Sequence, residues 1–103
     1  MRERWLGASG LRVPEIAVEG EDVELGDDSV RSGGEDVRAV VLEDVEDVQA
    51  LEEAHRAGVA VVVRAEDETG VATALARPEV SCVAVPPERR ELRELDLRRL
   101  KYG

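Results

Sequence analysis

Val59-Ala60-Val61-Val62-Val63 is the stretch that decides the fold, because five apolar residues in a row predict a strand buried on both faces. Similar apolar runs stand on either side of it, at Ala39–Leu42 and Val80–Val85. The segments between these runs carry apolar residues at helical spacing. Strands that alternate with helices are typical of a parallel sheet. We therefore expect an α/β fold with a small, mainly parallel βαβαβα sheet that resembles part of a βα barrel.

Capping residues mark the ends of the expected helices. Asp44 is placed to cap the first helix, with Asp47 three residues later, and Gly58 is expected to end it. The second helix is expected around Glu68–Arg77. A last helix is expected to begin near Pro87, although part of this segment also alternates like a strand and that alternative stays open. The apolar residues of this last segment are Leu92, Leu95, Leu97 and Leu100.

The first 36 residues differ from the rest of the chain, because glycines divide them into short segments. A short hairpin that turns at Gly20-Glu21-Asp22 is the structure we expect there, and the rest of this segment is expected to be irregular. We expect residues 1–103 to form a single domain. It would consist of a Gly-rich acidic segment, 1–36, and βα units over 37–103.

One face of the expected sheet needs a cover. Right-handed crossovers place both helices on the same face when strand order follows the sequence. The run Val59–Val63 is nevertheless apolar on both faces. The cover could be the N-terminal segment, a helix sent across by a reversed strand order, or another chain. Because the N-terminal segment is short and acidic, we expect a protein partner or a homodimer on this face.

The composition indicates an acidic, soluble protein. The formal net charge is -10, and the 15–53 stretch holds fifteen acids but only Arg31 and Arg38 as bases. Arg is far commoner than Lys and Asn is absent, which favours a thermophilic source, although a GC-rich genome would also favour Arg. No apolar run is long enough to span a membrane, and the single Cys forms no internal disulfide. We therefore expect a cytoplasmic protein without membrane contact.

The sequence predicts no catalytic residue, metal site or cofactor. No phosphate-binding glycine loop is present, and one His with one Cys is too few for a zinc site built from those ligands. His55 lies late in the first expected helix, where the helix dipole favours it. Cys82 lies within an expected strand and is interpreted as a small core residue.

Acidic residues follow the expected strands, and they support an alternative function. The carboxyl ends of parallel strands meet at one edge of a sheet, where ligands bind in many α/β proteins. Carboxylates there can bind Mg²⁺ or act as acid and base, so a small-molecule enzyme completed by dimerisation stays open as the alternative. The residues of this alternative site are Glu43, Asp44, Glu66, Asp67 and Glu88.

Basic residues gather near the C-terminus, where residues 88–101 hold six bases and four acids. Such a segment can contact a partner or the phosphates of RNA. Ion pairs within a solvated helix are the other interpretation. The residues expected to contact a partner or RNA are Arg64, Arg89, Arg90, Arg93, Arg98, Arg99 and Lys101.

The segment from Val63 to Pro86 resembles part of the archaeal ribonuclease P protein component 3, a TIM-like barrel related to PHP-type phosphoesterases. A strand, a short helix ending near Pro78-Glu79-Val80 and a strand ending in Pro86 occur at the spacing of that family. The match covers about half of the chain when the preceding Val40–Ala57 unit is included. The later strands of the family barrel are missing, and the Asp-His that often follows the strand proline has no counterpart near Glu88–Glu94.

The resemblance implies a shortened, non-catalytic subunit that docks to another protein of a ribozyme complex and aids tRNA processing. A binding or assembly protein is therefore our leading prediction from the sequence, with the ribonuclease P subunit as its most specific form. A homo-oligomeric structural domain is a further alternative.

Overall fold

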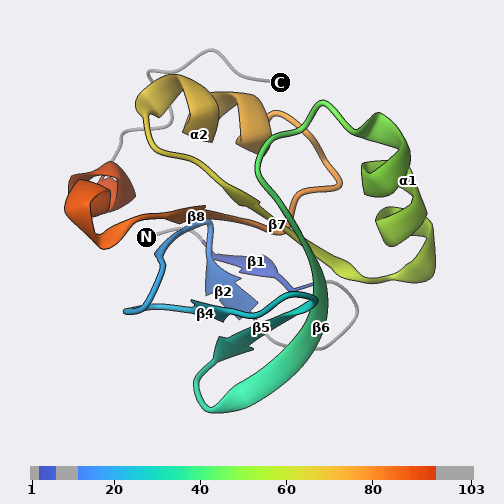
Figure 1. Cartoon of the computed structure of the whole chain (residues 1–103), viewed down its shortest axis with the longest axis horizontal. Coiled ribbons are helices and arrows are strands. Elements are labelled where there is room, and N and C mark those ends of the chain that lie inside the picture. The colour runs from blue at the N-terminus through green and yellow to red at the C-terminus, as the bar shows by residue number, and fades with distance from the viewer. Residues whose placement is uncertain (1–2, 7–11, 95–103) are drawn as a thin grey trace.

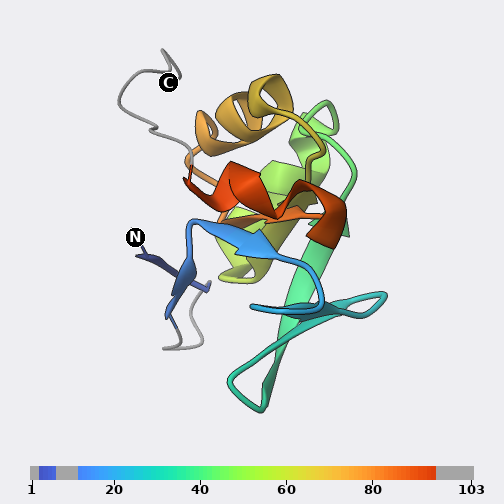
Figure 2. The same ribbon diagram turned by 90° about the vertical axis from the view of Figure 1, so that its left-hand side faces the viewer.

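The computed structural model describes residues 3–6 and 12–94, and it has the mixed α/β architecture of Figure 1. A six-stranded sheet curls into a half-barrel, and the helices of the described residues lie on its outer side. A separate pair of short strands lies across from these helices (Figure 2). The strands are β1 (Glu3–Trp5), β2 (Arg12–Pro14), β3 (Ile16–Val18), β4 (Glu24–Leu25), β5 (Ser29–Ser32), β6 (Glu35–Leu42), β7 (Ala60–Arg64) and β8 (Cys82–Val85). The helices are α1 (Val48–Ala57), α2 (Glu68–Leu75) and the 3₁₀-helix η1 (Pro87–Glu94).

The βα units predicted from the sequence are present in the predicted order. In the sheet, β6, β7 and β8 are parallel neighbours, joined by α1 and α2. The prediction of a mainly parallel sheet was wrong, because the full order β3-β8-β7-β6-β5-β4 includes two antiparallel pairings. A two-residue turn at Gly33 and Gly34 produces the β5–β6 hairpin. Both residues have positive φ, which glycine adopts without steric cost.

The hairpin expected at Gly20 does not form. Gly20 does turn the chain, with φ of 91°, but the strand before it pairs with β8 in parallel. The strand after the turn pairs with β5 instead. The Val18 amide, which faces away from β8, donates a hydrogen bond to the Asp22 carboxylate at 2.8 Å. This side-chain bond replaces the ladder bond that a hairpin would supply.

The helix ends follow the expected chemistry with one shift. The side chain of Asp47, not Asp44, caps α1 by accepting a hydrogen bond from the Ala50 amide at 3.0 Å. Asp44 instead accepts from the Glu46 amide in the preceding turn, so the predicted cap was one turn too early. Gly58 ends α1 in the left-handed conformation, as predicted.

The last described helix differs from the one expected. It begins at Pro87 as predicted, but it is a 3₁₀-helix interrupted at Arg89, whose φ and ψ are not helical. Leu92 is its one buried residue. Leu95 and Leu100, which were expected on the same helix, and Leu97, which belongs to the strand-like alternative, lie outside the described residues.

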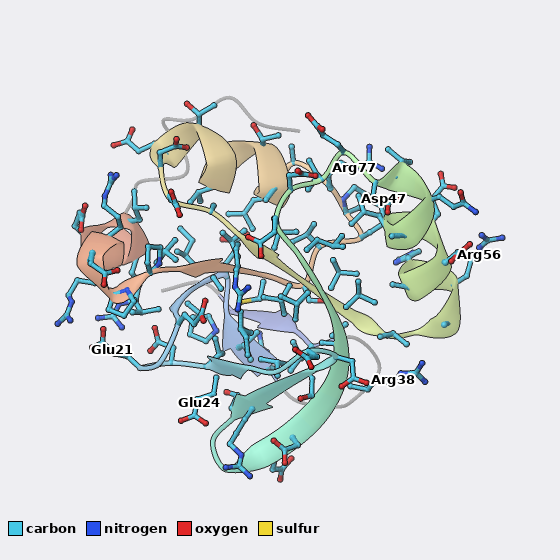
Figure 3. The ribbon with its side chains drawn as sticks, in the orientation of Figure 1. Glu21, Glu24, Arg38, Asp47, Arg56 and Arg77 are labelled. Atoms are coloured by element: carbon cyan, nitrogen blue, oxygen red, sulfur yellow. The ribbon has the colours of Figure 1, made fainter. Side chains whose placement is uncertain are left out.

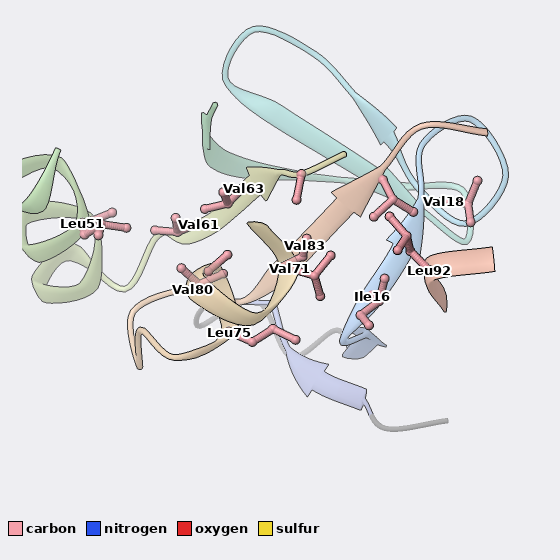
Figure 4. Close-up of a cluster of buried hydrophobic side chains, with 14 residues drawn as sticks. Ile16, Val18, Leu51, Val61, Val63, Val71, Leu75, Val80, Val83 and Leu92 are labelled. Atoms are coloured by element: carbon pink, nitrogen blue, oxygen red, sulfur yellow. The ribbon is translucent and has the colours of Figure 1, made fainter. Parts of the chain in front are cut away.

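The core lies on both faces of β7. Val61 and Val63 pack on the helix side, in the cluster drawn in Figure 4. Ala60 and Val62 face the concave side of the sheet. There they meet residues of the N-terminal segment and of the curled sheet, most of them fully buried, namely Leu6, Val13, Ala17, Val23, Val30, Ala39, Cys82 and Ala84. The chain therefore covers this face itself, by the N-terminal segment that was one of the covers considered from the sequence, and burial of the face does not require the expected partner or homodimer.

Most charged side chains of the described residues lie at the surface, and Glu15, which is 4% exposed, is the buried one among them. Figure 3 shows Glu21, Glu24, Arg38 and Arg56 at the periphery of the ribbon, and all four are exposed. Within the described ranges, no helix combines the length and the apolar character needed to cross a membrane.

Truncation of Leu6 tests whether the N-terminal segment belongs to the core. Leu6 is 0% exposed, so we expect Leu6→Ala to lower the free energy of unfolding by about 2–5 kcal/mol, because it removes buried methyl groups and leaves a cavity. The matched control is Val48→Ala, since Val48 is 43% exposed and its truncation should change stability by less than about 0.5 kcal/mol. Denaturant unfolding measures both, and equal stabilities of the two variants would contradict burial of the N-terminal segment in the core.

Candidate functional site

A cleft of about 390 Å³ opens at the carboxyl ends of the parallel strands. This is the edge at which open α/β sheets bind their ligands. The ends of β3, β6, β7 and β8 contribute to it together with the start of α2. Its lining residues are Glu19, Glu43, Arg64, Ala65, Glu66, Asp67, Gly70, Ala84 and Pro86. The lining thus combines four carboxylates and one guanidinium with small residues, namely Ala65, Gly70, Ala84 and Pro86.

Arg64, at the end of β7, is bound by two carboxylates of the cleft. Its Nε and Nη2 donate to the two carboxylate oxygens of Glu19 at 3.1 and 3.3 Å. Its Nη1 donates to Oε1 of Glu43 at 3.0 Å. These hydrogen bonds, from Glu43 first and then from Glu19, raise the pKa of the Arg64 guanidinium above its ordinary value. The cation therefore neutralises acids of its own chain, although it was expected from the sequence to contact a partner or RNA.

Glu19 is the site residue that sequence reasoning missed. It follows the apolar run Ile16-Ala17-Val18, as Glu43 follows the strand run that ends at Leu42. The missing information was the parallel pairing of β3 with β8, which brings Glu19 to the same edge as Arg64. The sequence pattern that could have identified Glu19 is an apolar triplet followed directly by an acidic residue.

Three of the five predicted acids come together in the cleft. Glu43, Glu66 and Asp67 line it, whereas Asp44 and Glu88 do not. Asp67 also caps α2 by accepting a hydrogen bond from the Gly70 amide at 2.7 Å. The exposed carboxylate of Glu66 has no hydrogen-bond or ion-pair partner among the residues that the structure describes.

The described arginines of η1 contact groups of the same chain. Arg93 donates to both oxygens of Asp22, at 3.0 and 3.2 Å, and Arg90 lies 3.5 Å from Glu21. Nη1 of Arg89 donates to the backbone carbonyl of Glu66 at 2.9 Å, at the rim of the cleft. The structure therefore distributes Arg64, Arg89, Arg90 and Arg93 over separate ion pairs and carbonyl contacts. Arg98, Arg99 and Lys101 lie outside the described residues.

The single His and Cys lie away from the cleft lining. His55 is exposed in the last turn of α1, and Cys82 is fully buried in the concave core, as expected of a structural residue. No cluster of three or more potential metal ligands among His, Cys, Asp and Glu is found in the ranges 3–6 and 12–94.

Comparisons with protein-family models, with curated proteins and with solved structures found no match to this chain.

The Arg89–Glu91 pair beside the cleft gives a pH-dependent prediction. The hydrogen bond from Nε of Arg89, at 2.6 Å, lowers the pKa of Glu91 below its ordinary value. A lowered pKa means that the pair stabilises the folded state above the ordinary pKa of a glutamate. This contribution is lost as the pH falls through the lowered pKa. We expect Arg89→Gln to return the pKa of Glu91 toward the ordinary value in an NMR titration.

Arg90→Gln is the matched control, because Arg90 binds Glu21 and the Pro87 carbonyl rather than Glu91. A Glu91 pKa that responds equally to both substitutions would contradict the pairing.

Proposed function

We propose that this protein is a non-catalytic binding and assembly protein that docks a basic protein partner at the strand-end cleft. The observation that carries the proposal is the charge of the cleft, whose lining holds four acids against one arginine. That arginine is already bound by Glu19 and Glu43. The formal net charge of -10 adds a long-range attraction for basic surfaces, which speeds association.

Glu66 and Asp67 are the acids through which the partner binds. Glu66 carries a carboxylate without a partner in the described part of the chain. One oxygen of Asp67 caps α2, and its second oxygen has lone pairs for a further donor. A lysine or arginine of the partner would meet both side chains at the start of α2. Arg64 remains with Glu19 and Glu43 in this arrangement, so docking leaves the ion pairs of β7 intact.

The most specific form of the proposal is a shortened ribonuclease P protein subunit that aids tRNA processing in the cytoplasm of a thermophile. It rests on the resemblance of the Val63–Pro86 segment to that family. The sequential units β6-α1-β7-α2-β8 in a curled sheet are compatible with a part of a βα barrel. In this form the cleft docks a protein subunit, and the basic C-terminal segment contacts RNA.

A small-molecule enzyme is the second candidate, because the cleft lies where α/β enzymes bind their substrates. Glu43, Glu66 and Asp67 would then act on the substrate as acids or bases, in a site completed by dimerisation. Glu43→Ala in the source cells separates the candidates, because docking binds the partner through Glu66 and Asp67 and leaves Glu43 with Arg64, whereas the enzyme needs all three acids. Retention of function by the Glu43→Ala variant contradicts the enzyme.

Affinity capture from the source cells tests the docking proposal. We expect the tagged wild-type chain to retain a basic protein, and the Glu66→Gln/Asp67→Asn variant to lose at least about 90% of it, since a paired charge at an interface is worth about 2 kcal/mol or more. The Asp67→Asn substitution preserves the cap of α2, because the amide oxygen of an asparagine accepts the same hydrogen bond. Mass spectrometry and RNA sequencing identify what is captured.

The matched control is Glu35→Gln/Glu52→Gln, which removes the same charge from two exposed residues that do not line the cleft. Equal capture by the two double variants would contradict docking at the cleft. Capture of a basic protein without any ribonuclease P protein or RNA would contradict only the most specific form.

A further inference from the structure

Arg64 lies at the carboxyl end of the concave face, above the apolar core. Side chains alternate along a strand, so Arg64 is on the same face of β7 as Val62, which belongs to the concave cluster. Its register partner on β8 is Ala84, a small residue that lines the cleft and is 1% exposed. Because β8 lies between β7 and β3, the guanidinium reaches Glu19 across this small residue. Glu43, at the end of β6, meets it from the other side.

Three carboxylate oxygens converge on this one guanidinium. Both oxygens of Glu19 accept from it, at 3.1 and 3.3 Å, and one oxygen of Glu43 accepts at 3.0 Å. Carboxylate oxygens gathered around a single positive charge are also the ligands that a hard divalent cation such as Ca²⁺ requires. The guanidinium therefore occupies the position between the two acids at which such an ion would bind.

We propose that Arg64 is an internal cation that makes the cleft selective: it keeps divalent metal ions out and leaves Glu66 and Asp67 to an ammonium or guanidinium group of the partner. The exclusion of metal ions stands by itself, whereas the identity of the accepted cation deepens the proposed docking function and rests on it. A metal ion at Glu19 and Glu43 would have to displace the guanidinium, whose side chain is only 37% exposed. Displacement would leave a partly buried charge without its anions, which is costly.

The two remaining carboxylates suit an organic cation better than a metal ion. One oxygen of Asp67 accepts the hydrogen bond of the Gly70 amide at 2.7 Å, which leaves its second oxygen and the carboxylate of Glu66. Ca²⁺ takes about six to eight oxygen ligands and Mg²⁺ requires a near-ideal octahedron, so these two neighbouring residues would leave most ligand positions to water. An ammonium or a guanidinium is satisfied by a few hydrogen bonds to carboxylate oxygens.

Replacement of Arg64 tests the inference by a gain of metal binding. The Arg64→Gln substitution removes the cation and frees Glu19 and Glu43, so that these acids can share an ion with Glu66 and Asp67. We expect this variant to bind Ca²⁺ at least about tenfold more tightly than wild type in isothermal titration calorimetry, because the number of charged ligands tunes Ca²⁺ affinity over several orders of magnitude. Circular dichroism and thermal unfolding in the absence of Ca²⁺ establish that the variant is folded.

Two control variants separate the position of the charge from its loss. Arg64→Lys keeps a cation at the end of β7 and should bind Ca²⁺ no more tightly than wild type. Arg38→Gln removes the same charge from an exposed residue that does not line the cleft (Figure 3). Equal Ca²⁺ affinity of the Arg64→Gln and Arg38→Gln variants would overturn the inference.

A measurement on the wild-type chain decides the matter even when Arg64→Gln does not fold. We expect the NMR signal of the Arg64 Nε–H group, which donates to Glu19, to stay in place when millimolar Ca²⁺ is added. A shift of this signal that saturates with Ca²⁺ would show that the ion displaces the guanidinium, and it would overturn the exclusion.

These outcomes are separable from that of the docking proposal. Metal binding is measured on the purified chain without a partner, so Ca²⁺ binding by wild type overturns the exclusion whatever protein the cleft captures. Unchanged capture by the Glu66→Gln/Asp67→Asn variant contradicts docking and leaves the metal result standing. With both proposals correct, added Ca²⁺ should reduce capture of the basic protein by Arg64→Gln but not by wild type. Undiminished capture by the Ca²⁺-loaded variant would contradict a role of Arg64 in selecting the partner's cation.

Discussion

Burial of β7 on both faces is the constraint on which the rest of the structure depends. Its residues Ala60–Val63 are at most 2% exposed, so the helices must cover one face and the concave layer the other. A strand without contact to water must pair its backbone on both edges, and β6 and β8 supply those hydrogen bonds. Polar side chains are then excluded from the middle of the strand and occur at its end.

This exclusion explains why the charged groups gather at one edge of the sheet. Four parallel strands end there, and an acidic or basic residue follows or ends three of them, Glu19, Glu43 and Arg64. Arg64 is the cation that keeps two neighbouring acids compatible at this edge. The same edge receives η1, whose arginines bind the turn after β3 and the loop before α2. Core packing and surface charge are thus consequences of the same topology.

Local patterns in the sequence predicted those helices and strands that pair with or pack against an element close to them along the chain. The apolar runs and the glycine and aspartate signals located β6, α1, β7, α2 and β8. Pairings between distant segments were not predictable in this way. The contacts of Arg64 with Glu19 and of Arg93 with Asp22 join residues 45 and 71 positions apart. No local propensity encodes such a contact, because it depends on which edge of the sheet accepts β3.

The residues that cover the concave face could not be predicted from local sequence patterns either. Its residues are small and come from several short elements and connections, so no single segment of the N-terminal region was predicted to cover a strand. The fold depends on a core completed within one chain, which leaves charged groups at the ends of the parallel strands. Native-state hydrogen exchange of the β7 amides over a range of protein concentrations tests this claim most directly. A core completed by one chain predicts that these amides are among the slowest to exchange and that their rates do not change with protein concentration. Protection of β7 that rises only with concentration would show that a second chain completes the core, and it would contradict this claim.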